Sequence, residues 1–253
     1  MRPPVRLPID DLRNEPYASI LCYPRAEPSE IENRISELSG IGVTEVEFTG
    51  GGSAMNIPVL GKGYVGVVIV AHVNGERYAL KIRRTDSSRN DLFHEAEMLK
   101  RANDAEVGPK FLRVTKNFML SQLIDGCLLG KWLENNKNVD GFRSIFVNIL
   151  EQCRRLDDIG MDHGELSMAP KHILTDSQGI PFIIDFEAAS IHRKVANVTS
   201  VCQYLFLGTC SVPGLVREVM GERDRDGIVN SLRAYKRERS DDSFETLVRT
   251  CLR

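Results

Sequence analysis

Two β-type segments joined by Asn74-Gly75 constrain the fold of this chain more than any other feature of its sequence. Residues 64–73 and 77–83 are rich in β-branched and apolar side chains. Asn-Gly between them favours a type I′ turn, because both central residues of that turn need a positive φ. The two segments are therefore predicted to form an antiparallel hairpin.

The remaining pattern places strands first and helices after them. Further strands are predicted at residues 43–48, 110–114 and 117–123, with a helix over 88–103 capped by Ser88. From about residue 126 the chain becomes helical, apart from a hairpin that pairs residues 172–174 with 182–185. Strands followed by helices predict an α+β fold of two lobes, a β-rich N-lobe with one helix and a helical C-lobe.

The first 40 residues are expected to form an N-terminal extension, irregular to residue 27 and helical afterwards. Ser29 and Glu32 have the spacing of a capping box, and Gly40 stands where a helix would end. The N-lobe is then expected over residues 41–122 and the C-lobe over 123–253.

Composition excludes several classes of protein. The formal net charge of -2 gives no overall attraction to nucleic acid or to an anionic membrane. The longest apolar run, residues 65–71, is too short to span a bilayer, and the first residues lack the apolar core of a signal peptide. Six scattered cysteines without a C-x-x-C pair predict reduced thiols in a cytoplasmic protein.

A phosphate-binding loop is predicted where Gly61, Gly63 and Gly66 form a G-x-G-x-x-G pattern. In a dinucleotide-binding fold these glycines would open a helix. Here a strand follows, and the next strand carries Lys81 between apolar neighbours, which favours a kinase-type arrangement. The alternatives are a plain β-turn for the glycines and a solvated strand residue for Lys81.

A carboxylate partner for Lys81 is expected on the helix predicted over residues 88–103. At about 100° per residue, Glu95 falls within the apolar stripe of that helix, whereas Glu97 falls outside it. An unpaired carboxylate on an apolar face is costly, so Glu95 is predicted to pair with Lys81. The alternative is a glutamate at the helix edge that reaches water.

The candidate chemistry lies in the second half of the chain. Asp162-His163-Gly164-Glu165 precedes the hairpin that His172 opens, and Asp185-Phe186-Glu187 closes that hairpin. A histidine and an acidic residue come first, an apolar hairpin follows, and Ile-Asp-Phe comes last. This order resembles the catalytic and metal-binding loops of kinases.

Taken together, residues 57–206 resemble the protein-kinase-like superfamily. The similarity is greatest to its minimal branches, the RIO-type atypical kinases and the KEOPS-complex kinase, and among these to predicted archaeal serine/threonine kinases. Shared features are Lys81-Ile82-Arg83-Arg84 with Asp86, the helix sequence from Glu95 to Leu99, and Val107-Gly108-Pro109.

The resemblance implies a bound ATP with Mg²⁺, or Mn²⁺ in its place, and gives each residue a role. Asp185 would hold the metal, and Glu165 would orient the acceptor hydroxyl and receive its proton. His163 would brace the loop. A hinge at residues 122–125, with Gln122 and Leu123, would present backbone groups to the adenine.

The chain departs from the family pattern at three positions. Glu165 replaces an aspartate, and Glu187 replaces the glycine that usually follows Asp-Phe. Two extra residues in the loop place His172 where an asparagine metal ligand is expected, so His172 is either a metal ligand or a histidine that only enters the strand. Little activation segment follows Asp185, and no Ala-Pro-Glu motif, so the usual peptide-docking platform is not expected.

The leading hypothesis is ATP-dependent phosphoryl transfer to a protein serine or threonine, on an unidentified partner or on the chain itself. One alternative is a small-molecule kinase of the aminoglycoside or choline type. Another is an ATP-binding interaction protein with little turnover. The basic residues Arg233, Lys236, Arg237 and Arg239 could contact RNA, or could form a solvated charged face; no membrane partner is expected.

Overall fold

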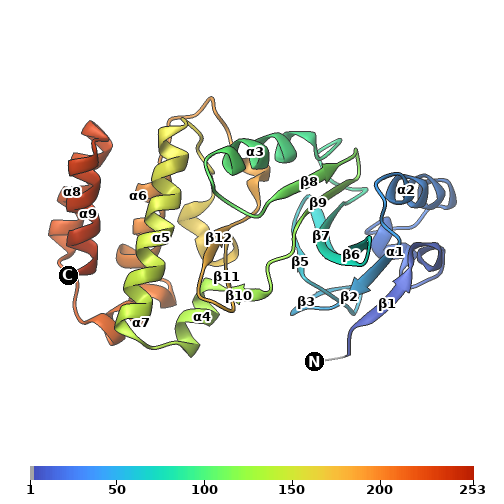
Figure 1. The fold of residues 1–253 in the computed structure, drawn as a ribbon, viewed down its shortest axis with the longest axis horizontal. Coiled ribbons are helices and arrows are strands. Elements are labelled where there is room, and N and C mark those ends of the chain that lie inside the picture. The colour runs from blue at the N-terminus through green and yellow to red at the C-terminus, as the bar shows by residue number, and fades with distance from the viewer. Residues whose placement is uncertain (1–2) are drawn as a thin grey trace. The chain divides into compact units, whose positions relative to one another are not determined.

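The chain folds into a strand-rich unit and a helix-rich unit (Figure 1), in the order that the sequence predicts. The structure, a computed structural model, describes residues 3–253. One unit comprises the chain up to Lys100 together with Pro109–Leu123, and the other comprises Arg101–Gly108 and Ile124–Arg253. Helices and mostly antiparallel strands occur together, so the predicted α+β class is confirmed.

A seven-stranded antiparallel sheet organises the first unit, with the strand order β1-β2-β6-β7-β9-β8 and with β5 paired to β6. The strands are β1 (Val5–Pro8), β2 (Glu45–Phe48), β5 (Gly61–Lys62), β6 (Gly66–Val73), β7 (Glu76–Arg83), β8 (Phe111–Val114) and β9 (Phe118–Gln122). A separate hairpin joins β3 (Gly52–Ala54) to β4 (Ile57–Val59).

The predicted central hairpin is present. Val73 of β6 pairs with Glu76 of β7, and the two residues between them, Asn74 and Gly75, both have positive φ, at 51° and 82°. This is the backbone that a type I′ turn requires. Strands predicted at 43–48, 110–114 and 117–123 are also present, each shortened by one or two residues.

Residues 3–27, predicted to be irregular, contain three regular elements. They are β1, the 3₁₀ helix η1 (Ile9–Arg13) and the short helix α1 (Ala18–Leu21), followed by α2 (Pro28–Gly40). Leu12, Leu21 and Leu38 from these elements share one buried cluster with Phe48 and Leu80 of the sheet. The N-terminal segment is thus part of the same hydrophobic core as the sheet.

Both helix starts predicted in this unit are wrong. Helix α2 is preceded by Glu27 as its N-cap, with Pro28 in the first turn and no side-chain cap, because proline already fixes the φ needed at a helix start. Helix α3 (Phe93–Asp104) begins five residues after Ser88. The side chain of Asp91 accepts a hydrogen bond of 3.0 Å from the amide of Phe93 there, so Asp91 takes the role predicted for Ser88.

Helices dominate the second unit, in which α5 is the longest. They are α4 (Leu129–Asn135), α5 (Val139–Asp158), η2 (Leu166–Lys171), η3 (Phe186–Ala188), α6 (Asn197–Cys202), the π-helical η4 (Gln203–Leu207), α7 (Ser211–Met220), α8 (Arg225–Glu238) and α9 (Asp241–Leu252). Phe146 of α5 makes edge-on ring contacts with Phe142 and Phe206, with ring centroids 5.6 Å and 5.5 Å apart. These aromatic rings lie in the core of this unit.

A small sheet in this unit places the predicted chemistry. Strand β10 (Gly126–Leu128) pairs with β11 (Ile173–Asp176), and β11 pairs with β12 (Pro181–Ile183). Ile173 lies opposite Ile183, and the amide of Ile184 donates a 2.9 Å hydrogen bond to the carbonyl of His172. The predicted hairpin is therefore confirmed, and its register brings His172 beside the residue before Asp185.

Among residues 3–253, no single helix is both long enough and apolar enough to cross a membrane. One sharply bent pair of segments, residues 197–207 and 211–220, meets the length and composition criteria only when the two are taken together.

A fully buried guanidinium ties the N-terminal helices to the sheet. Arg34 of α2 donates hydrogen bonds of 2.7 Å to the carbonyls of both Leu21 and Arg83, and it also reaches Asn117 at 3.2 Å. Its Nε donates to Glu30 at 2.7 Å. One side chain therefore satisfies buried backbone acceptors from α1 and β7, in addition to the loop before β9.

We expect Arg34→Ala to destabilise the protein by roughly 3–5 kcal/mol, because the carbonyls and Glu30 lose their charged partner in a buried site. Urea unfolding followed by circular dichroism measures the change. Arg13→Ala is the matched control: Arg13 forms an exposed ion pair with Glu32, and exposed pairs contribute little to stability. Equal effects of the two substitutions would contradict the structural role given to Arg34.

Candidate functional site

The glycine-rich segment forms a tight turn between β5 and β6. The amide of Gly63 donates to the carbonyl of Gly66 at 2.8 Å. Arg84 holds the turn from outside, since its amide donates to Val65 at 2.8 Å and its guanidinium donates to Gly63 at 3.0 Å. Tyr64 at the tip is 90% exposed. The turn is thus anchored at its base and open at its tip.

The fold requires glycine at only one of the three predicted positions. A Cβ on Gly66 would lie 2.8 Å from the carbonyl oxygen of Ile82 and 3.0 Å from Cγ of Lys81. A Cβ on Gly61 would meet nothing within 4 Å among the described residues, and one on Gly63 would meet only a single atom at 4.0 Å. Neither of these two glycines has a positive φ. Packing and backbone conformation therefore leave the backbone at Gly61 and Gly63 approachable from outside.

Lys81 and Glu95 form the predicted ion pair. Nζ of Lys81 lies 2.8 Å from each carboxylate oxygen of Glu95, and both residues are buried. Leu80 and Ile82 face the core that contains the N-terminal helices, so strand alternation turns Lys81 to the other face of β7. The pair satisfies two charges that would be costly to bury singly.

The predicted hinge coincides with the boundary between the two units, because Leu123 is the last residue of one and Ile124 the first of the other. The amide of Gln122 donates to the carbonyl of Lys110 at 2.8 Å. That N–H group is therefore already satisfied inside the first unit. Leu123 follows the end of β9 directly and remains a predicted contact for a nucleotide base.

A buried polar network in the second unit fixes the loop that carries the predicted catalytic residues. Asn197 accepts a 2.8 Å hydrogen bond from the amide of His163 and donates one of 2.7 Å to the carbonyl of Met161. Asn197 also donates twice to Asp157, at 3.0 Å and 2.8 Å, and the Tyr235 hydroxyl donates to the same carboxylate at 2.9 Å. Helices α5, α6 and α8 are thereby linked to this loop.

Burial of the Asp157 carboxyl raises its pKa above the ordinary value, although the hydrogen bonds from Tyr235 and Asn197 act in the opposite direction. The pKa of the Tyr235 hydroxyl is also raised, first by burial and then by the neighbouring carboxylate. Sequence periodicity could not identify this network, because its members are polar residues on helix faces that are otherwise apolar.

His163 has the geometry of a structural residue. Its Nε2 lies 3.0 Å from the carbonyl oxygen of Ile184, so this nitrogen carries the proton. Burial lowers the pKa of His163 to about 4, which keeps the ring neutral near pH 7. The ring also contacts Phe186 edge-on at 5.0 Å. These contacts agree with the bracing role expected for His163.

Asp162 is also engaged within the loop. It accepts hydrogen bonds from the amide of Ala196 and from Nε of Arg193, both at 3.1 Å. The next residue but one, Gly164, has a φ of +88°, and a Cβ there would collide with the Arg193 side chain. The contacts of Asp162 and the close packing at Gly164 therefore fix the backbone immediately before Glu165.

Glu165, His172 and Asp185 lie together in the second unit. Nε2 of His172 is 3.6 Å from a carboxylate oxygen of Glu165, and its Nδ1 is 3.8 Å from one of Asp185. One ligand atom from each of the three residues lies within 4.8 Å of the others. His172 is buried, whereas the Glu165 side chain is 40% exposed.

Asp185 adopts a left-handed backbone, with φ 69° and ψ 70°. Side chains other than glycine rarely occupy this region, and aspartate is one of the few that tolerate it. Asp185 lies two residues after the end of β12, and η3 begins at the next residue. Strain of this kind is common where a side chain must be aimed for function.

The donor set suits a divalent cation chemically. Two carboxylates supply negative charge and hard oxygen donors, and the imidazole supplies a nitrogen donor of intermediate softness. Mg²⁺ prefers oxygen donors, and imidazole is more usual around first-row transition metals. The residues thus fit a divalent metal, with the imidazole as the unusual member for Mg²⁺.

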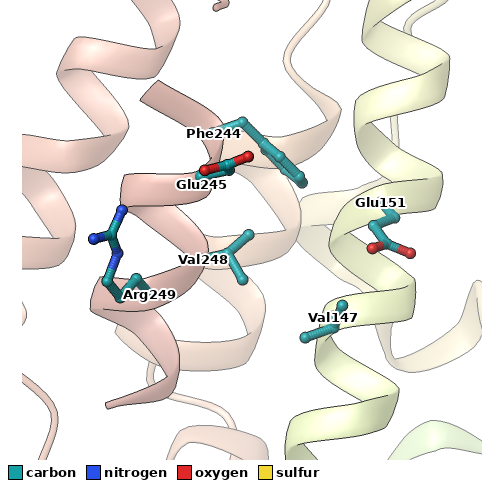
Figure 2. A pocket seen from close by; sticks show the side chains of 6 residues that line it. All are labelled: Val147, Glu151, Phe244, Glu245, Val248 and Arg249. Carbon is teal, nitrogen blue, oxygen red and sulfur yellow. The ribbon is translucent and has the colours of Figure 1, made fainter. Parts of the chain in front are cut away.

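A separate surface groove of about 500 Å³ lies between α5 and α9 (Figure 2). Its lining mixes apolar and charged side chains: Val147, Glu151, Phe244, Glu245, Val248 and Arg249. None of these residues belongs to the predicted site.

The basic residues suggested for RNA lie on or just after α8. Arg233, Lys236 and Arg237 are exposed, while Tyr235 between them is buried. An exposed basic face is compatible with RNA contact and with simple solvation, so RNA contact stays a prediction.

A scan against protein-family models gave no match to this chain. A search among curated proteins found no match either.

Removing the amide of Asn197 should loosen the loop before Glu165. We expect Asn197→Ala to lower the free energy of unfolding by roughly 2–4 kcal/mol, because it leaves the Met161 carbonyl and the His163 amide without partners and removes one hydrogen bond to Asp157. Differential scanning calorimetry would detect the loss. Asn230→Ala, on the exposed face of α8, should have almost no effect. A stable Asn197→Ala protein would show that the network is dispensable.

Proposed function

We propose that this protein transfers a phosphoryl group from ATP to a serine or threonine hydroxyl of a protein. The single observation that carries the proposal is the buried Lys81–Glu95 ion pair, whose lysine side chain passes directly over Gly66 of the open glycine turn. A lysine held by a helix carboxylate beside a glycine-rich turn is the arrangement with which kinases orient the phosphates of ATP.

The exposure of the glycine turn supports phosphate binding at this place. Glycine at positions 61 and 63 serves neither packing nor backbone conformation among the described residues. Absence of side chains there lets a ligand reach the backbone amides, which are good donors to phosphate oxygens. The amide of Gly63 is used within the turn, and Gly61 is paired with Val68 of β6, so the amides at the tip are the groups proposed to bind phosphate, with Gly61 leaving room for the ligand.

The second unit is proposed to supply the metal-binding and acceptor-binding groups. Asp185 would hold a divalent cation, Mg²⁺ or Mn²⁺, with His172 as a further ligand. A bound divalent cation neutralises charge on the phosphates and fixes their orientation. Glu165 would accept a hydrogen bond from the acceptor hydroxyl and receive its proton, which its 40% exposed side chain permits.

The two halves of this proposed site belong to different units of the chain. We propose a kinase-like two-lobe arrangement on the basis of the sequence order, in which glycine turn, lysine, helix glutamate, catalytic loop and metal aspartate follow one another as they do in that superfamily. The partly exposed carboxylate of Glu165 and the short segment after Asp185 favour phosphorylation of one partner protein, or of the chain itself, over recognition of many peptides.

The proposal is tested by incubating the full chain with γ-labelled ATP and Mg²⁺ or Mn²⁺ and measuring labelled protein and free phosphate. Lys81→Ala and Asp185→Asn should each abolish transfer, the second while leaving most of the metal-free nucleotide affinity. Glu165→Gln should also lose transfer, because an amide cannot accept the hydroxyl proton. Tight ATP binding without any turnover would replace the kinase proposal by a nucleotide-binding interaction protein.

The glycines give a second, independent prediction. Gly63→Ala should leave the melting temperature nearly unchanged but weaken ATP binding, since a methyl group would obstruct a ligand and nothing else. Gly66→Ala should instead destabilise the fold, because its Cβ would be forced against Ile82 and Lys81. Calorimetric ATP titration and thermal melting of both variants test this. Unchanged ATP affinity in Gly63→Ala would place the nucleotide elsewhere.

A further inference from the structure

The most unusual member of the proposed site is His172, which stands beside two carboxylates. Two ligand atoms that bind one metal at about 2.1 Å are separated by roughly 3.0–3.4 Å in octahedral or tetrahedral geometry. The observed distances from the imidazole nitrogens of His172 to Glu165 and Asp185 are 3.6 Å and 3.8 Å. The two distances start from different ring nitrogens, of which only one can bind a given metal. An adjustment of a few tenths of an ångström therefore brings one carboxylate into its coordination sphere, and the other carboxylate, within 4.8 Å, needs a larger shift.

A second observation points independently to a ligand. The side chain of His172 is 91% buried, since 9% of its surface is exposed, and its Nδ1 makes no hydrogen bond within residues 3–253. Burial of an unsatisfied ring nitrogen is unfavourable unless something else occupies its lone pair or its proton. The backbone of His172 accepts a hydrogen bond from the amide of Ile184, and its ring contacts the ring of His163, with centroids 5.6 Å apart.

We propose that Glu165, His172 and Asp185 bind a first-row transition-metal dication in preference to Mg²⁺, with an imidazole nitrogen of His172 as a ligand. Mg²⁺ sites consist of oxygen donors and water, and an imidazole adds little to them. For Mn²⁺ and the metals that follow it in the series, a nitrogen donor increases affinity. Only the role of the metal in catalysis rests on the proposed function. Its binding does not, because all three ligands lie in one unit of the chain.

The metal and the acceptor hydroxyl can share Glu165. A carboxylate has two oxygens, so one can bind a metal while the other accepts a hydrogen bond. Glutamate at this position reaches farther than the aspartate usual in kinases, which suits a residue that serves His172 and the acceptor together. One metal site would thus explain why both Glu165 and His172 differ from the kinase pattern.

The test uses the metal-stripped full chain without nucleotide. Mn²⁺ is titrated while the electron paramagnetic resonance signal of free Mn²⁺ is recorded, and Mg²⁺ is then added as a competitor. Echo modulation from a coordinated ¹⁴N nucleus is measured on the same samples. We expect preferential Mn²⁺ binding with ¹⁴N modulation in the wild type, and loss of Mn²⁺ binding in Asp185→Asn.

In His172→Asn the ¹⁴N modulation should disappear and Mn²⁺ affinity should fall by at least about 10-fold, because loss of a direct ligand costs at least as much as loss of an outer-shell partner. Mg²⁺ affinity should fall much less. His192→Asn, which alters an exposed histidine, should behave as the wild type. Should His172→Asn fail to fold, the wild-type modulation and Asp185→Asn still decide the question.

Absence of ¹⁴N modulation, or an equal ratio of Mn²⁺ to Mg²⁺ affinity in wild type and His172→Asn, would overturn the metal inference. Failure of the proposed function looks different. Selective Mn²⁺ binding through His172 without any transfer of labelled phosphate would remove the kinase proposal and retain the metal site. Transfer of labelled phosphate by a wild-type protein that shows no ¹⁴N modulation with Mn²⁺ would retain the kinase proposal and remove the metal inference.

Discussion

Charges and polar groups taken out of water must find partners, and in this protein those partners come from segments far apart in the chain. Arg34 joins α1, α2, β7 and the loop before β9 through one buried guanidinium. Asp157 and Asn197 join three helices to the loop before Glu165. Lys81 and Glu95 join the sheet to α3. Apolar burial makes both units compact, but these polar contacts determine which backbone segments lie next to one another.

The same requirement separates supporting residues from those available to a ligand. Nε2 of His163, the carboxylate of Asp162 and the amide of Asn197 make hydrogen bonds to the backbone around them, although Nδ1 of His163 makes none within residues 3–253. Glu165 retains a partly exposed carboxylate, and His172 retains a buried nitrogen that makes no hydrogen bond in the described part of the chain. Rigid support behind a partly open group is the arrangement expected at a binding or catalytic site. The proposed site in the second unit has both parts.

Local rules predicted the elements in which sequence and backbone geometry are tightly coupled. Asn74-Gly75 specified a turn and thus the central hairpin, and helical periodicity separated Glu95 from Glu97. The sequence did not reveal β1, because this four-residue strand contains a proline and buries only Leu7. Helix starts were misplaced because neither helix uses the serine that fits the motif: α2 begins at Pro28 without a side-chain cap, and α3 begins beside Asp91. The Asp157–Asn197 network escaped because polar residues that meet only in the fold leave no periodic signal.

Close contact between Gly66 and the Lys81 side chain has a consequence for how the chain can vary. The lysine crosses the space that any side chain at position 66 would occupy. A side chain at position 66 is excluded even beside a shorter residue at 81, because the carbonyl oxygen of Ile82 also lies 2.8 Å from a Cβ there; a shorter residue at 81 would in addition remove the lysine that pairs with Glu95. Gly66, Lys81 and Glu95, which lie on two strands and a helix, thus depend on one another. In a library of related sequences they should change together or not at all.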